Sequence, residues 1–473
     1  MEKLNELLER ILQRVNINLR EPLFDAAPYI RGLVPLEQMV KFYAFYGIAP
    51  QYPPNFYFSR SNLAGSYFLG KCHVSDSILY KSDIRGDELK RKGDIFHYEG
   101  FAVPLHEDET IHIKNSCLVK TLVHNNSHDP EHPEEFTIYN TVSTHYANIH
   151  GSDVEGCFLG PFSTVDLTTL HDCVIGEFVY LQKKELAHHQ VPAGTIWISA
   201  GDAFDFHYRH DPEILKNYIR FEPGGMPQGI FMDFVEDRKE DFQRIFDAFN
   251  LESFGAIPDS ASLSRYAVVK PKVRIKENVL ISQRAYVKNS YMGKGANAQE
   301  NCFIIDSHLA GCNVTAHGAK IITAQMGENV FVGFNSFLRG ADEFPLKIGE
   351  NSIIMPHTII DLAEAVTIAP SSVVWGFIRN QDDVDENSIP LSELAAVDGE
   401  LTRGRMRFKG SGKRFADAFR HRIDHILEAN GAYFDGREKM GHAQQSQIIS
   451  YNIIQPYPEG ANKGLYPTIE ILP

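Results

Sequence analysis

The chain has 473 residues, of which 43% are hydrophobic and 23% are charged, and its formal net charge is −15. This composition is typical of a globular protein, and the length allows two or three domains. The acidic balance argues against a nucleic-acid-binding protein, which would normally present a basic surface.

The N-terminal stretch MEKLNELLERILQRV alternates apolar and charged residues. This pattern predicts an amphipathic helix and argues against a signal peptide. No run of about 18 apolar residues occurs, so we expect no membrane span. The six cysteines are dispersed without a CxxC pair, which favours reduced thiols in a cytoplasmic protein. We therefore predict a helical N-terminal extension over residues 1–70 of a cytoplasmic protein.

Aliphatic side chains recur at a short fixed step in two later parts of the chain. In the first part the step is five or six residues, over Ile149, Val154, Leu159, Val165, Leu170, Ile175 and Leu181. In the second it is six, over Ile348, Ile354, Ile360 and Val366. Neither a helix nor a single strand sustains such a step, whereas a parallel β-helix does, because each hexapeptide forms one short strand and one corner. We predict a mainly β protein with two tandem parallel β-helices, over residues 71–200 and 263–380.

Helical patterns separate and follow the two repeats. Residues 201–262 contain FVEDRKEDFQRIFDAF, in which Phe242, Ile245, Phe246 and Phe249 share one helical face, so we expect a helical connector there. Residues 381–473 contain KRFADAFRHRIDHILEANG, a predicted helix that ends at Gly431, followed by a Pro- and Gly-rich tail. We expect these helical N- and C-terminal extensions to cover the ends of the coils, which would otherwise expose sheet edges.

The repeat resembles that of the hexapeptide-repeat superfamily. The resemblance implies that the coils are left-handed and that the protein is a homotrimer.

Two histidines lie five residues apart in STHYANIHG, namely His145 and His150. On a triangular β-helix five residues carry the chain to the next face, so two such imidazoles converge only between subunits of a trimer. His124 ends the apolar run LVH, 21 residues before His145, which we interpret as one coil of 18 residues plus a small insertion. Three neutral imidazoles with an open fourth position suit a catalytic zinc ion.

Residues 75–200 resemble the γ-class carbonic anhydrases, whose motif is an apolar run ending in His, a loop and then His-x4-His-Gly. The resemblance implies that His124 and His150 are metal ligands from one subunit and that His145 is donated by its neighbour. It implies zinc, or iron or cobalt on the same ligands, in a site shared within the homotrimer.

The segment KSDIRGDELK resembles the Arg-x-Asp segment of the same family. This resemblance implies that Arg85 and Asp87 form an ion pair between subunits and that Glu88 shuttles protons. The stretch LKRKGDIFHYEGFAVPLHEDE must then loop out before His124. Leu118 and Val119 stand where the family has a polar pair that orients the metal-bound water, so we expect weak activity.

Three functions follow as hypotheses. The first is a metal-dependent hydratase resembling γ-class carbonic anhydrase, in which a metal-bound hydroxide attacks carbon dioxide, with no nucleic-acid or membrane partner. The alternative is a hexapeptide acyltransferase that uses coenzyme A, with His308 in IIDSHLAGCNV as the base. In that motif Gly311 stands where a second histidine is expected. The third is a non-catalytic β-helix scaffold.

Overall fold

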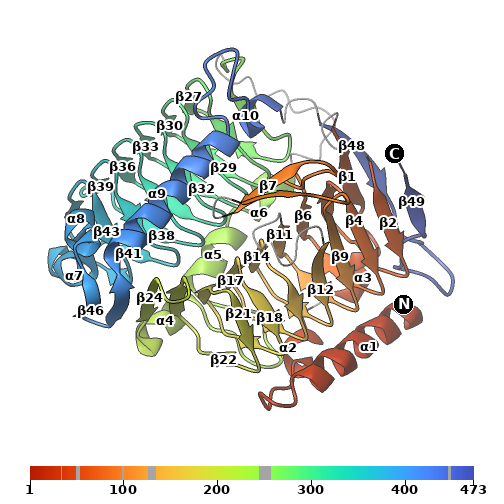
Figure 1. The fold of residues 1–473 in the computed structure, drawn as a ribbon. Helices are drawn as coiled ribbons and strands as arrows, with labels where there is room; N and C mark the ends of the chain where they lie inside the picture. The colour runs from red at the N-terminus through yellow and green to blue at the C-terminus, as the bar shows by residue number, and fades with distance from the viewer. Residues whose placement is uncertain are drawn as a thin grey trace. The chain divides into compact units, whose positions relative to one another are not determined.

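The computed structural model describes residues 1–33, 35–49, 54–98, 101–125, 135–243, 257–445 and 449–472. The chain forms two compact units (Figure 1). The first comprises Met1–Thr195, Pro212–Ile230 and Ile448–Pro473, and the second comprises Ile196–Asp211 and Phe231–Gln447. Each is built on a parallel β-helix, so the predicted fold class is confirmed. No helix among the described ranges is long and apolar enough to cross a membrane.

The β-helix of the first unit has three parallel faces. Face 1A contains β1 (Ala44–Ile48), β3 (Tyr67–Leu69), β6 (Asp83–Arg85), β11 (Leu122–His124), β14 (Asn148–His150), β17 (Thr164–Asp166) and β20 (Tyr180–Gln182). Face 1B contains β5 (Ile78–Tyr80), β10 (Cys117–Val119), β13 (Val142–Ser143), β16 (Phe158–Leu159), β19 (Val174–Ile175) and β22 (Gln190–Val191). Face 1C contains β2 (Phe56–Ser59), β4 (Cys72–Ser75), β9 (Thr110–Lys114), β12 (Glu135–Tyr139), β15 (Val154–Glu155), β18 (Thr169–His171) and β21 (Glu185–Ala187).

Sixteen residues make one regular coil of the first unit, as the bond from Ser82 N to the Ser66 hydroxyl shows. Two coils are longer. The coil between β6 and β11 carries the hairpin β7 (Ile95–Tyr98) and β8 (Phe101–Pro104), which is the predicted looped-out insertion. The coil between β11 and β14 carries residues 126–134, which lie outside the described residues. The coil of 18 residues that we expected here is therefore wrong.

Helix α1 (Glu2–Asn18) covers face 1B. Its residues Leu4, Leu8, Ile11 and Val15 recur at helical spacing and are buried in one cluster with strand residues such as Ile78. The other helices of this unit are α2 (Ala27–Ile30), α3 (Leu36–Met39) and α4 (Pro212–Tyr218).

The terminal extensions differ from the predicted ones. The coil begins at Ala44 rather than at residue 71, because β1 and β2 already pair in parallel with β3 and β4. From the predicted C-terminal extension, β48 (Ser450–Ile454) and β49 (Ile469–Ile471) pair antiparallel with β1 and β2. The last part of the chain therefore supplies edge strands to the first unit and is not a loose tail.

The β-helix of the second unit also has three parallel faces. Face 2A contains β25 (Ser262–Leu263), β28 (Leu280–Ile281), β31 (Asn297–Ala298), β34 (Val314–Thr315), β37 (Phe331–Val332), β40 (Ile353–Ile354) and β43 (Ser372–Val374), with β45 (Ser388–Pro390) antiparallel to β43. Face 2B contains β26 (Val268–Val269), β29 (Tyr286–Lys288), β32 (Phe303–Ile305), β35 (Lys320–Ile322), β38 (Phe337–Arg339), β41 (Ile359–Asp361) and β44 (Phe377–Ile378). Face 2C contains β27 (Arg274–Ile275), β30 (Tyr291–Met292), β33 (His308–Leu309), β36 (Ala324–Met326), β39 (Leu346–Ile348) and β42 (Thr367–Ile368).

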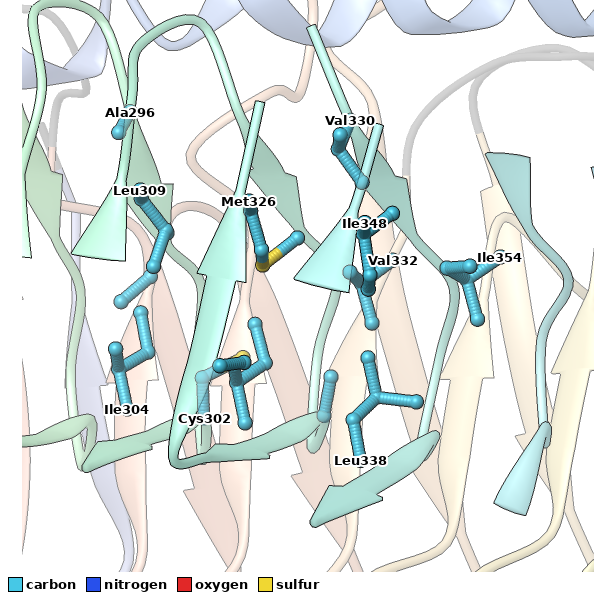
Figure 2. Close-up of a cluster of buried hydrophobic side chains, with 14 of the residues drawn as sticks. Ala296, Cys302, Ile304, Leu309, Met326, Val330, Val332, Leu338, Ile348 and Ile354 are labelled. Atoms are coloured by element: carbon cyan, nitrogen blue, oxygen red, sulfur yellow. The ribbon is translucent and has the colours of Figure 1, made fainter. Parts of the chain in front are cut away.

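Aliphatic side chains fill the second β-helix (Figure 2). On face 2B the register stacks one inward residue of each coil on the next, over Val287, Ile304, Ile321, Leu338 and Ile360. Each of these side chains is fully buried. The predicted stacking of aliphatic residues is confirmed, and it makes the coil core a continuous apolar column.

Helices cover two faces of the second unit. Phe231 and Phe234 of α5 (Ile230–Glu236) pack on Phe337 of face 2B, and α6 (Lys239–Gln243) follows. Helix α9 (Gly412–Ala429) runs along the coils, with Phe419 6.2 Å from Phe331 of face 2A between ring centroids (Figure 1). The remaining elements are β23 (Thr195–Ser199), β24 (Phe204–Arg209), α7 (Gln381–Asn387), α8 (Leu391–Ala395), β46 (Asp398–Arg403), β47 (Met406–Ser411) and α10 (His442–Gln445).

The predicted helical connector over residues 201–262 is not one element. It contains strand β24, which pairs with β47, and helices α4, α5 and α6, and its parts belong to both units. Phe242 packs 6.2 Å from Phe303 between ring centroids. Ile245, Phe246 and Phe249, which we expected on the same helical face, lie outside the described residues.

Lys320 is buried on face 2B, and its ammonium donates to the Gly318 carbonyl at 2.6 Å. Burial lowers the pKa of Lys320 to about 8, below the value of about 10.4 for an unfolded chain. Between these pH values the unfolded chain binds more protons, so the free energy of unfolding rises with pH from about 8 to about 10.4. We expect Lys320→Met to remove this rise, which amounts to about 3 kcal/mol.

Urea unfolding of wild type and Lys320→Met at several pH values measures this difference. The exposed Lys288→Met in the same β-helix is the control and should leave the rise intact. Parallel stability curves for wild type and Lys320→Met would contradict the prediction.

Candidate functional site

One register position of face 1A collects polar side chains coil after coil. In chain order this ladder, the polar ladder, is Leu69, Arg85, His124, His150, Asp166 and Gln182. The residue before each of them on the strand, such as Val123 or Ile149, is fully buried in the coil. Because neighbouring residues of a strand point to opposite sides, the ladder residues project outward from the coil.

His124 and His150 are neighbours in the polar ladder. Their ring centroids are 5.3 Å apart and the rings are nearly perpendicular. His150 Nδ1 lies 2.8 Å from Asp166 Oδ1, and the Tyr180 hydroxyl donates to the other oxygen of Asp166. Asp166 is fully buried, so it fixes the orientation of His150 and leaves Nε2 of that ring for another partner.

Arg85 and Asp87 form a bidentate ion pair within one chain. Arg85 Nε donates to Asp87 Oδ1 at 3.0 Å, and Nη2 donates to Oδ2. The inter-subunit pair that we predicted is therefore corrected to a pair inside the first unit, because Asp87 follows Arg85 by two residues at the end of β6. Asp87 and Glu88 each approach Nε2 of His124, at 3.6 and 3.8 Å. The role of Glu88 as a proton shuttle stays a prediction.

His145 occupies a different place. It lies at the corner between β13 and β14 and is not in register with His124, which pairs with His150 instead. Its side chain is 1% exposed, and burial together with Lys120 holds its pKa well below the usual value. The contacts described for His145 are to Tyr146 and Lys120. The structure thus brings together His124 and His150 of the predicted triad and sets His145 apart.

The two imidazoles and the nearby carboxylates are a donor set that accepts zinc or a similar cation. Metal binding by His124, His145 and His150, and the sharing of that metal between subunits, stay predictions. Leu118 and Val119 lie on β10 of face 1B and are fully buried. Val119 belongs to the cluster under α1, so these two side chains serve packing on another face.

The second unit has a groove of about 840 Å³ on face 2C. Two rows of side chains line it. The strand row is Arg274, Tyr291, His308 and Gln325, which are in register on successive strands. The corner row is Lys272, Asn289 and Asp306, which precede the strand row by two residues and have positive φ. Seventeen residues make one coil here, so each row repeats at that interval.

His308 is exposed in the middle of this groove. Its ring stacks on that of Tyr291 with a centroid distance of 4.5 Å and an interplanar angle of 6°. Asn289 donates to Asp306 at 2.7 Å, which holds the carboxylate beside the histidine strand. Lys272 and Arg274 place two exposed cations at the end of the groove formed by the earlier coils. The groove therefore combines an accessible imidazole with a site for an anionic group.

The sequence analysis singled out His308 and missed its neighbours. The missing signal was the coil length, because counting back 17 residues from His308 reaches Tyr291, and another 17 reaches Arg274. In the first unit, counting forward 16 residues from His150 reaches Asp166, which we also missed.

Comparisons with known proteins agree with this architecture. A family model described as a hexapeptide repeat including loop matches residues 101–223. The solved structure of a "putative acetyltransferase" from Desulfovibrio desulfuricans G20 is 54% identical, with a TM-score of 0.94, covering 100% of this chain and 99% of that chain. Two proteins named bifunctional protein GlmU are similar over shorter stretches. They come from Caldicellulosiruptor saccharolyticus, with 28% identity over 24% of this chain, and Streptococcus uberis, with 29% identity over 26%. The chain spans about a quarter of the length of these two proteins.

These relatives overturn one prediction. The relative that is similar along the whole chain is described as an acetyltransferase, and none of the three is described as a carbonic anhydrase. The predicted carbonic anhydrase-like hydration of carbon dioxide is therefore wrong. The full-length similarity, the matching repeat and the two β-helices lead to one conclusion about family: the chain belongs to the hexapeptide-repeat superfamily of left-handed parallel β-helix proteins.

Proposed function

We propose that this protein is an acyltransferase that moves an acyl group, in the simplest case acetyl, from a coenzyme A thioester to a small acceptor. The observation that carries the proposal is the exposed His308 inside the groove on face 2C, beside Lys272 and Arg274. The full-length relative described as a putative acetyltransferase supports the same reaction class.

His308 acts as the general base. Its imidazole takes the proton from the hydroxyl or amine of the acceptor as the acceptor attacks the thioester carbonyl. The new bond joins the acceptor oxygen or nitrogen to the carbonyl carbon, and the carbon–sulfur bond breaks. The proton then passes from His308 to the departing thiolate, so the products are the acylated acceptor and the free thiol of coenzyme A.

The stacked ring of Tyr291 restricts how the imidazole of His308 turns and so helps to orient it. Lys272 and Arg274 attract the phosphates of coenzyme A, because both cations reach into the groove from neighbouring positions of one coil. Asp306, held by Asn289, supplies an acceptor or counter-charge for the second substrate.

The experiment is an assay for thiol release from acetyl-coenzyme A with a panel of small amines and alcohols, with mass spectrometry of the acylated product. Acceptor-dependent release of thiol supports the proposal. Background hydrolysis alone for every acceptor, together with no binding of coenzyme A by calorimetry, would overturn it.

The cations of the groove give a separate prediction. We expect Arg274→Gln to raise KM for acetyl-coenzyme A by about 10- to 100-fold, because a hydrogen bond to a charged phosphate is worth about 1.5–3 kcal/mol. The turnover number should change little, since Arg274 does not touch the reacting carbonyl in this scheme. Lys276→Gln, an exposed cation of the same coil that does not line the groove, is the control. Equal KM values for wild type and Arg274→Gln would place the coenzyme elsewhere.

The homotrimer and a metal at the polar ladder are predictions that this proposal does not need. Light scattering measures the first, and elemental analysis of the purified protein measures the second.

A further inference from the structure

The first unit contains a second cavity, of about 240 Å³, on the face covered by the N-terminal segment. Aromatic rings dominate its walls. Phe24 and Tyr29 come from the segment after α1, Phe158 comes from β16, and Phe221 follows α4. Glu177 is the one carboxyl group among the described residues that line the cavity, and those residues include no lysine or arginine.

The four rings form one connected cluster. Ring centroids are 4.7 Å apart for Phe24 and Phe158, 5.3 Å for Tyr29 and Phe158, and 5.2 Å for Tyr29 and Phe221. Most of these pairs are tilted, so the rings do not all turn the same edge to the cavity. Such a cluster presents both the apolar area and the electron-rich ring faces that attract cations.

The charges around the cavity are negative. Burial raises the pKa of Glu177, which shows that its carboxylate is poorly solvated. Burial, then Glu177, then Glu222 raise the pKa of Tyr29, so both carboxylates face the ring at the cavity wall. Glu222 itself is exposed beside Phe221. A positive guest would gain from both carboxylates and would restore the charge balance that burial disturbs at Glu177.

We propose that this cavity is a binding site for a small alkylated ammonium ion. The aromatic rings hold the alkyl groups by apolar contact and cation–π attraction, and Glu177 supplies the counter-charge. A primary ammonium fits less well, because its three N–H donors need acceptors that a mostly aromatic wall does not provide. The site does not depend on the acyl-transfer reaction proposed for the second unit.

The test compares choline with its uncharged isostere 3,3-dimethylbutan-1-ol by calorimetry on the full chain. We expect choline to bind and the isostere to bind at least about tenfold more weakly, because only the cation gains from ring faces and the carboxylate. Glu177→Gln should weaken choline binding by about tenfold or more, and the exposed Glu185→Gln should not change it. Equal binding of choline and the isostere, or no binding of choline, would overturn the proposal.

A second measurement protects against a Glu177→Gln variant that does not fold. Choline affinity for the wild-type protein should rise as pH rises through the pKa of Glu177, since the carboxylate form binds the cation. The groups that face it are Tyr29, which ionises at much higher pH, and Glu222. Carbon NMR of the Glu177 carboxyl should show its pKa falling when choline is bound. An unchanged carboxyl titration would likewise overturn the proposal.

Discussion

Replacing His308 by alanine should lower the turnover number of acyl transfer by about 100- to 10,000-fold, the usual contribution of a general base. The imidazole is exposed in the groove and lies on a strand of the coil, so its removal leaves the aliphatic column underneath intact. The KM for acetyl-coenzyme A should stay nearly the same, because the phosphates are held by Lys272 and Arg274. Steady-state kinetics with the best acceptor from the panel measures both parameters.

Two matched variants interpret the result. His425→Ala removes an exposed histidine on α9 of the same unit and should leave the kinetics unchanged. His150→Ala removes the imidazole oriented by Asp166 in the first unit. If His308→Ala keeps full turnover while His150→Ala loses it, the base lies on the polar ladder and the assignment of the groove is wrong.

Replacing Asp87 by alanine should destabilise the protein by about 3–5 kcal/mol, the typical cost of removing one partner of a buried ion pair. The side chains of Arg85 and Asp87 are 12% and 7% exposed, so the variant leaves a guanidinium with little access to water. The variant also removes a carboxylate 3.6 Å from His124. Chemical denaturation of wild type and variant measures the change in the free energy of unfolding.

The paired variant Arg85→Met with Asp87→Leu is the informative control, because it removes both charges together. It should recover most of the lost stability, since apolar replacements of a buried pair are often neutral or better. Glu185→Ala, at an exposed position of face 1C, should change stability by less than about 0.5 kcal/mol. A loss below about 1 kcal/mol for Asp87→Ala would show that the pair is well solvated, because exposed pairs contribute about that much or less.

The sequence predicted the fold because the inward residues of a β-helix must repeat with the coil. Val287, Ile304 and Ile321 stack in register and are fully buried, so their spacing is visible in the chain itself. The strands at the chain ends escaped prediction for the opposite reason. Strand β48 pairs with β1 across nearly the whole length of the sequence, and no local period records such a partner.

The candidate sites were only partly predictable. An outward side chain meets the residue one coil away, so an error of two residues in coil length points to the wrong neighbour. With an 18-residue coil we placed His145 above His124, whereas the true register puts His150 there and Asp166 next to it. Arg85 joins the same ladder only because a hairpin loops out between β6 and β11, and the length of that insertion cannot be derived from the period.

The pairing of β48 and β49 with β1 and β2 has a consequence for how the protein is made. On the ribosome, the strands near residues 44–59 emerge about 390 residues before their antiparallel partners. At about 5–20 residues per second, this edge waits about 20–80 s for its partner strands. An unpaired sheet edge is a template for association with other chains. We therefore expect the growing chain, more than the finished protein, to be the species that needs a chaperone.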